Sequence, residues 1–154
     1  MLTELITLLT CDGLEGDDLA DCVARIEASP ADPELEWIEG DGPAAFMQFA
    51  ILAELGDFVA IGDKVDELHE EISEQFADPL PAFPGQEMPA AEYFQWLDGQ
   101  LAARPTPYEI LLWGNHFDDN LYAFIVRRKD TARVLDLAGG LGLLAERATR
   151  RQLT

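Results

Sequence analysis

Basic residues are scarce in this sequence, and nearly all of them lie in its last third. Ten lysines and arginines stand against 30 acidic residues, which gives a net charge of −20. The first 100 residues contain 24 aspartates and glutamates, but only Arg25 and Lys64 are basic there. Such a field repels nucleic acid and anionic membrane surfaces and attracts basic proteins. We therefore expect neither nucleic acid nor a membrane as a partner.

Cysteine and serine are also rare. The two cysteines, Cys11 and Cys22, form neither a disulfide framework nor a zinc motif, so we expect both to be reduced packing residues. The alternative is that one is reactive or that they pair on oxidation. The two serines, Ser29 and Ser73, lie outside any Gly-x-Ser-x-Gly turn, which excludes a serine hydrolase of that type. The phosphate-binding Gly-x-x-x-x-Gly-Lys-Ser/Thr loop is missing as well, and we expect no cofactor.

Long hydrophobic runs are missing too. The most apolar run, Ala44 to Leu55, is interrupted by Gln48 and Glu54 and is shorter than the ~20 residues that span a bilayer. The segment 1–5 lacks the features of a secretory signal. We therefore expect a cytoplasmic protein.

The length and the 48% hydrophobic content fit one domain over residues 1–154. Apolar residues recur at helical spacing in six places, and proline, serine or glycine bounds most of these segments. The predicted helices are 2–11, 17–29, one from Pro43 to Leu55 that we expect to be central in the core, 65–76, 89–104 and 130–140.

Three short runs are typical of strands. Phe58 to Ile61 is framed by Gly-Asp pairs, and Tyr108 to Trp113 with Leu121 to Val126 has the pattern of a β-hairpin. Both faces of the last run are apolar, so we expect an inner strand that is covered on both sides. The sequence therefore predicts an α+β fold, in which a small sheet of about three strands, including this C-terminal hairpin, is covered by five to six helices.

The segment Val134 to Gly142 is similar to the first motif of S-adenosylmethionine-dependent methyltransferases, in which a strand runs into a Gly-x-Gly turn. That motif normally opens a fold of roughly a hundred further residues. Only twelve residues follow Gly142 here. We therefore interpret the segment as a helix that ends at Gly139-Gly140, followed by a docked tail.

The loop of the predicted hairpin contains His116, Asp118, Asp119 and Asn120. Carboxylates beside an imidazole could bind a cation such as Mg²⁺ or Ca²⁺, so His116, Asp118 and Asp119 are candidate metal ligands. Asp and Asn are also the ordinary residues of turns, and the spacing matches no calcium loop. His69 lacks the second histidine of a zinc protease motif, so we expect it on the flank of its helix beside acids.

The main candidate binding surface is acidic. The predicted helix 65–76 places its apolar residues on one line and its acids on the other faces. The acids form the candidate binding set, which comprises Asp66, Glu67, Glu70, Glu71 and Glu74. The basic run at 127–133 is expected to pair with the acidic half of the chain or with a second copy of it, so a homodimer is one alternative.

Residues Tyr108 to Leu143, and more loosely Gly56 to Phe76, resemble a family of small acidic bacterial domains of unknown function. The resemblance rests on three segments, namely 114–126, the helix start Asp-Thr-Ala-Arg at 130–133 and the acidic strand-to-helix step at 57–66. It implies a compact α+β domain and no catalytic residues.

Together these patterns favour a non-enzymatic binding domain that presents its acidic helices, especially those at Asp17 to Glu27 and Asp63 to Glu74, to a basic protein. Immunity proteins that block nucleases, and proteins that mimic the charge of DNA, work in this way. The alternative is a metal-binding or metal-dependent enzyme domain that uses His116, Asp118 and Asp119. A third interpretation is that the acids only keep the protein soluble.

Overall fold

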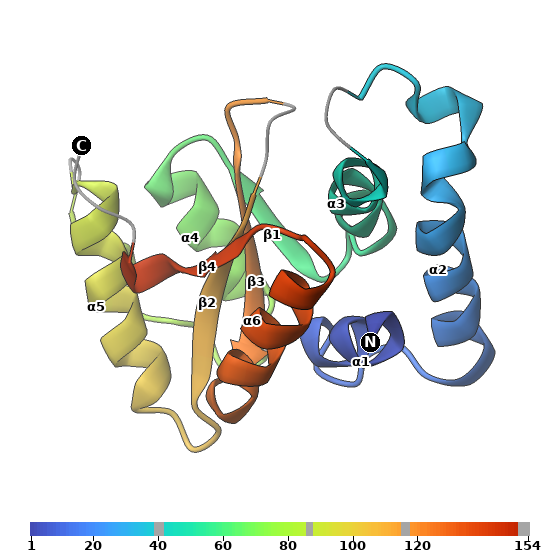
Figure 1. Ribbon diagram of the computed structural model, residues 1–154. Coiled ribbons are helices and arrows are strands. Elements are labelled where there is room, and N and C mark those ends of the chain that lie inside the picture. The colour runs from blue at the N-terminus through green and yellow to red at the C-terminus, as the bar shows by residue number, and fades with distance from the viewer. Residues whose placement is uncertain (39–41, 86–87, 115–117, 151–154) are drawn as a thin grey trace.

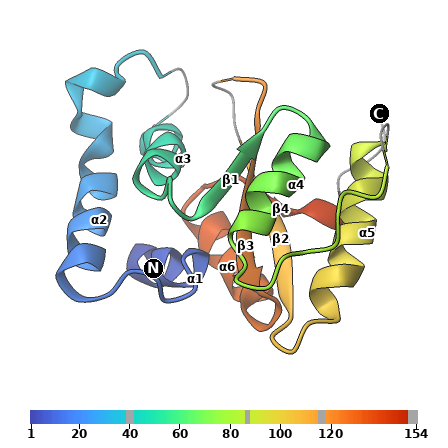
Figure 2. The same cartoon turned by 180° about the vertical axis from the view of Figure 1, so that it is seen from behind.

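The computed structural model describes residues 1–38, 42–85, 88–114 and 118–150. Its centre is an antiparallel sheet with helices on both faces (Figure 1). Helices α4 and α5 lie on one face, and α1 and α6 lie on the other, with α2 beyond them at the edge of the molecule (Figures 1 and 2). The predicted α+β fold is confirmed.

The sheet contains four strands in the order β1-β3-β2-β4, one more than the sequence predicted. The fourth strand is only three residues long and lies in the segment that we expected to be a docked tail. In the register, Gly62 lies opposite Leu121, Trp113 opposite Tyr122, and Trp113 also opposite Ala145. The strands are β1 (Val59–Gly62), β2 (Tyr108–Trp113), β3 (Leu121–Arg127) and β4 (Ala145–Arg147).

The helices agree with the apolar periodicity of the sequence, with small differences at their ends. Proline ends or begins several of them, as expected from its missing N–H. The α-helices are α1 (Leu2–Leu9), α2 (Gly16–Ala28), α3 (Pro43–Glu54), α4 (Val65–Glu74), α5 (Ala90–Ala102) and α6 (Thr131–Gly140). Within the described ranges, no helix is long and apolar enough to cross a membrane.

The sheet separates two apolar layers, because successive side chains of a strand point to opposite faces. Leu111, Trp113 and Phe124 pack with α1, α2, α3 and α6 on one side. Ile110, Leu112 and Ala123 pack with α4 and α5 on the other. The inner position predicted for 121–126 is therefore confirmed, since β3 pairs with both β1 and β2.

In the layer that contains α1, α2, α3 and α6, helix α1 rather than α3 packs on strand β3. Leu5, Ile6 and Leu9 of α1 are almost fully buried, and α1 contacts β3. Helix α3 packs mainly on α2 and leaves Ala53 exposed, so our expectation of a central α3 was wrong. Helix α3 is apolar on several sides because its residues pack in the core layer that also contains α2. Its link to the end of the sheet is the hydrogen bond from the Gln48 side chain to the carbonyl oxygen of Gly114.

The segment that is similar to a methyltransferase motif is helical. Residues 134–140 belong to α6, and Val134, Leu137 and Ala138 are buried in the core. The chain turns after α6 at Gly142, whose φ of 74° favours glycine. The interpretation as a helix ended by glycines is confirmed, because the residues that lead directly into these glycines are helical and do not form a strand.

Candidate functional site

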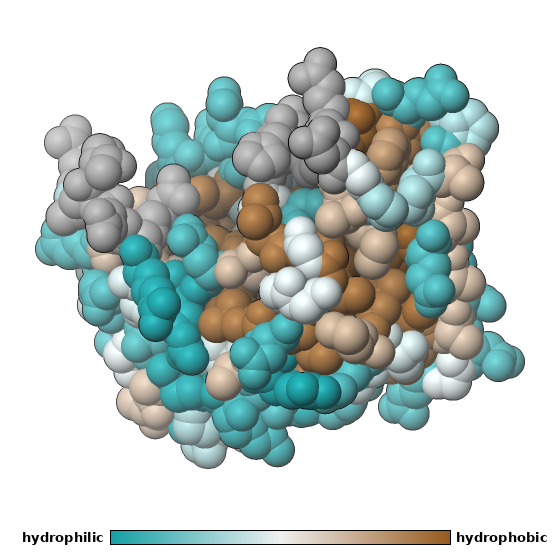
Figure 3. All heavy atoms as spheres, viewed as in Figure 1, coloured by the Kyte–Doolittle hydropathy of each residue, from teal (hydrophilic) through white to brown (hydrophobic). Residues whose placement is uncertain are grey.

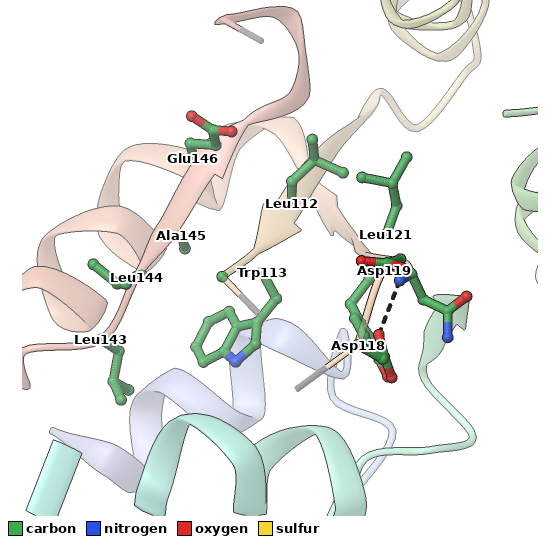
Figure 4. A pocket seen from close by; sticks show the side chains of 12 residues that line it. Leu112, Trp113, Asp118, Asp119, Leu121, Leu143, Leu144, Ala145 and Glu146 are labelled. Atoms are coloured by element: carbon green, nitrogen blue, oxygen red, sulfur yellow. Dashed lines mark hydrogen bonds between the residues drawn. The ribbon is translucent and has the colours of Figure 1, made fainter. Parts of the chain in front are cut away.

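A cleft of about 530 Å³ lies at the end of the sheet where β2, β3 and β4 meet. Its walls come from the end of β2, the start of β3 and the segment from the end of α6 into β4 (Figure 4). Apolar residues form much of the lining, and three carboxylates lie among them. The residues that line the cleft include Leu112, Trp113, Asp118, Asp119, Leu121, Tyr122, Leu144 and Glu146.

The walls of the cleft are fixed by Gln48 of α3, whose side chain is 5% exposed. Its Nε2 donates to the carbonyl oxygens of Gly114 and Leu144 at 2.9 Å each. Its Oε1 accepts the N–H of Leu144 at 2.8 Å, and its backbone oxygen accepts the indole N–H of Trp113 at 2.9 Å. One side chain therefore joins the end of β2 to the segment before β4.

Gln48 was not among the site residues that we predicted from the sequence. The only signal was a polar amide inside the most apolar run of the chain, because a buried polar group must find hydrogen-bond partners. Gly114 is part of the same packing, since a Cβ there would lie 2.6 Å from the Cβ of Leu144. The absence of a side chain at Gly114 lets the two walls approach each other.

Asp118 holds the start of β3 in a turn. One carboxylate oxygen accepts the backbone N–H of Asn120 at 2.9 Å, and the other accepts the Tyr122 hydroxyl at 2.6 Å. Burial raises the pKa of Tyr122, and the bond to Asp118 raises it further. Asp118 therefore has the geometry of an Asx turn, one of the two roles that its sequence context allowed.

The metal hypothesis concerns His116, Asp118 and Asp119. The structure brings Asp118 and Asp119 to one end of the cleft (Figure 4). His116 lies outside the described residues. In the part of the chain that is described, no group of three or more His, Cys, Asp or Glu side chains is placed to hold a metal ion. The metal site stays a prediction from the sequence.

The acidic α4 surface consists of Asp66, Glu67, Glu70, Glu71 and Glu74. All five side chains are exposed. Helix α4 lies on the side of the sheet that faces the viewer in Figure 2. Leu68 and Ile72 on the opposite side of α4 are fully buried. The predicted separation of acidic and apolar sides is therefore confirmed, although a binding role is not tested by it.

Like charges lie close together at the start of this surface. The carboxyl group of Glu67 shares a hydrogen bond with Asp63, and this contact raises the pKa of Glu67 above its usual 4.5. The negative charge of Asp63 acts in the same direction, whereas Lys64 opposes it more weakly. The carboxylates at the start of α4 therefore lie close enough for their negative charges to repel each other.

Five arginines form ion pairs elsewhere in the structure. Arg127, Arg128 and Arg133 bind Asp12, Asp98 and Glu4 at 2.6 to 2.7 Å, so the basic run pairs with the acidic half as one of our two expectations stated. Arg25 pairs with Glu54, and Arg147 pairs with Glu109. Across the described residues, none of these ion pairs involves the acidic α4 surface.

Glu109 and Arg147 anchor β4 beside the cleft. Glu109 is 3% exposed, and both of its oxygens accept hydrogen bonds from Nη1 of Arg147 at 2.9 Å. Arg128 approaches the same carboxylate at 3.8 Å and binds Asp98 more closely. The ion pair ties the short last strand to β2, next to the cleft residue Glu146.

His69 is buried inside the protein and is not on a flank beside acids as we expected. It is 4% exposed, and the rings of Phe83, Tyr93 and Trp96 surround it. Its Nδ1 lies 2.9 Å from the Tyr93 hydroxyl, and its Nε2 lies 2.8 Å from the carbonyl of Pro81. His69 thus joins α4 to α5 and to the proline-rich segment, which are remote in the sequence.

Both cysteines are free, as expected. Cys22 is buried, and the thiol of Cys11 lies 3.3 Å from the carbonyl of Ile125 as a hydrogen-bond donor. Burial raises the pKa of both thiols, so neither is an activated nucleophile in this structure.

Comparisons of the chain with protein-family models, with curated proteins and with solved structures gave no match. The site therefore has to be interpreted from its own geometry and charge.

Proposed function

We propose that this protein is an acidic binding domain that presents the acidic α4 surface to a basic protein. The observation that carries the proposal is that five exposed carboxylates share one side of a helix and form no ion pair with any described residue, while five arginines elsewhere are paired within the chain. The attraction of this surface for cations is therefore not cancelled internally. Such surfaces steer basic partners and accelerate their association.

Helix stability alone does not account for these acids. Asp66 and Glu67 lie in the first turn of α4, where negative charge favours a helix. Glu71 and Glu74 lie in the last turn, where negative charge opposes the helix dipole, and no basic residue is present there. These acids lower the stability of the helix and have no basic partner in its last turn. Functional surfaces often reduce stability in this way, so the acids fit a surface that binds cations.

The proposal is tested by capturing partners with the purified protein at ~50 and ~300 mM salt, because screening weakens exposed charge contacts. The triple variant Glu67→Lys, Glu70→Lys, Glu74→Lys reverses the acidic α4 surface. The control, Asp17→Lys, Asp18→Lys, Asp21→Lys, makes the same change of charge on exposed residues of α2.

We expect one basic protein to be retained in stoichiometric amount at the higher salt, to be lost with the α4 variant and to be retained by the α2 control. A set of basic proteins that all disappear at ~300 mM salt would mean that the charge is nonspecific. Equal losses with the two variants would mean that net charge, rather than the acidic α4 surface, governs binding.

A further inference from the structure

We propose that the cleft at the end of the sheet receives a cationic side chain, arginine or lysine, from the basic partner. The inference rests on the proposed function and assigns a second contact to the same partner. The acidic α4 surface supplies charge over an exposed area, whereas the cleft supplies a hollow with an apolar floor. A side chain that inserts into a hollow contributes more affinity than one on an exposed rim.

The floor of the cleft suits an aliphatic chain. Leu112 and Leu121 lie on neighbouring strands on the same face of the sheet, and Figure 4 shows both side chains at the same side of the cleft. Leu144 is 55% exposed at its edge, next to the buried Leu143. Apolar residues also reach the middle of the face drawn in Figure 3, where β4 and the end of α6 lie.

The charges at the edges of the cleft suit a cationic head group. Asp119 lies at the start of β3 and Glu146 lies on β4, so the two carboxylates border the cleft from opposite sides of β2. Both are exposed, and neither takes part in an ion pair within the described residues. The described residues that line the cleft include no lysine or arginine. Lysine and arginine combine an apolar stem with a charged end, which matches this arrangement.

The cleft and the acidic α4 surface lie at the same end of the sheet. Gly62, the last residue of β1, is paired with the cleft residue Leu121, and α4 begins three residues after Gly62. Figure 1 shows the connection from β1 to α4 at the same end as the start of β3. One basic partner can therefore contact the acids at the start of α4 and insert a side chain into the cleft.

The test uses small probes and ¹⁵N-labelled protein. The probes are N-acetyl-arginine N-methylamide, its lysine counterpart and the neutral N-acetyl-citrulline N-methylamide. Backbone amides report the site, together with the indole N–H of Trp113, which lines the cleft. The indoles of Trp37 and Trp96 are internal references, because neither residue lines the cleft.

We expect at least one cationic probe to shift the amides of Leu112, Leu121 and Leu144 and the Trp113 indole, with millimolar affinity. The citrulline probe should bind at least about fivefold more weakly because it lacks the charge. Asp119→Asn with Glu146→Gln should weaken the cationic probe roughly five- to tenfold. Glu70→Gln with Glu74→Gln, which removes two charges from α4, should change its affinity less than twofold.

Three results would overturn the assignment. The first is equal binding of the citrulline probe, which would show that charge is not recognised. The second is shifts that occur on α4 alone or nowhere. The third is displacement of the probe by Mg²⁺ or Ca²⁺ at micromolar concentration with shifts at Asp118 and Asp119, which would reassign the cleft to a metal. Retention of the basic partner through the acidic α4 surface, combined with any of these results, would leave the proposed function intact and remove only the cleft.

Discussion

Gln48 connects three segments of the chain through one side chain, and its removal has a predictable cost. The variant Gln48→Ala leaves the Gly114 carbonyl and the Leu144 N–H without their partner, so we expect it to lose about 2–3 kcal/mol of unfolding free energy. Gln95→Ala is the control, because Gln95 makes one exposed bond to the Thr149 carbonyl and its loss should cost less than about 0.5 kcal/mol. Urea unfolding measures both, and equal costs would contradict the role of Gln48.

Glu67 makes the stability depend on pH in a defined direction. Its pKa is raised in the folded protein. Its contribution to the free energy of unfolding is therefore fully present below its usual pKa of 4.5, and this contribution is lost as the pH rises through the pKa of the folded state. Glu67→Gln should therefore raise the melting temperature at pH 7, and the gain should shrink or vanish near pH 4.

The control is Glu71→Gln, which removes the same charge from α4 at a residue that does not bond Asp63. We expect a smaller gain at pH 7 for this variant. A lower melting temperature of Glu67→Gln at pH 7, or an equal gain at both pH values, would show that the contact between Glu67 and Asp63 does not govern this effect.

The roles of single residues could be predicted from the sequence where their partners are only a few positions away. The turn role of Asp118 depends on residues two and four positions away, and the acids of α4 are separated from its apolar line by helical periodicity. The burial of His69 was missed because its partners, Pro81 and Tyr93, are 12 and 24 positions away. Gln48 was missed for the same reason, since its partners are 66 and 96 positions away.

Among the elements, β4 depends most on tertiary contacts. Its three residues, Ala-Glu-Arg, show no alternation of apolar and polar side chains, so no strand could be predicted there. The strand forms because β2 offers a free edge and because Arg147 reaches the buried Glu109. The hairpin of β2 and β3 could be predicted, in contrast, because both strands and their connection are contiguous.

Arg147→Ala should therefore loosen β4. The variant leaves the buried Glu109 carboxylate with only Arg128 at 3.8 Å, and we expect a loss of about 2–3 kcal/mol. Hydrogen exchange of the β4 amides should accelerate more than that of β1. Arg150→Ala removes an exposed arginine three residues later and should change the stability by less than about 0.5 kcal/mol. Unchanged exchange in β4 of Arg147→Ala would show that the ion pair does not hold the strand.

At the scale of the whole molecule, charge is distributed in two ways. The arginines hold the C-terminal third against the N-terminal half through ion pairs such as Arg127 with Asp12 and Arg133 with Glu4. The hydrogen bond from Arg133 lowers the pKa of Glu4 and raises that of Arg133, which is the sign of a stabilising pair. Among the residues that the structure describes, the acidic α4 surface takes no part in this internal pairing. The charges of the C-terminal arginines and their acidic partners thus stabilise the fold. The charges of the acidic α4 surface, as we propose, bind a basic partner.

The most direct test of that proposal is a charge swap, measured by calorimetry with the captured basic partner. Reversing Glu67, Glu70 and Glu74 to lysine should weaken binding by at least about tenfold, and so should reversing the partner's contacting basic residues to glutamate. The doubly reversed pair should regain at least about tenfold in affinity. An affinity of the doubly reversed pair that is no better than that of either single reversal, or an α4 reversal without effect, would contradict the account.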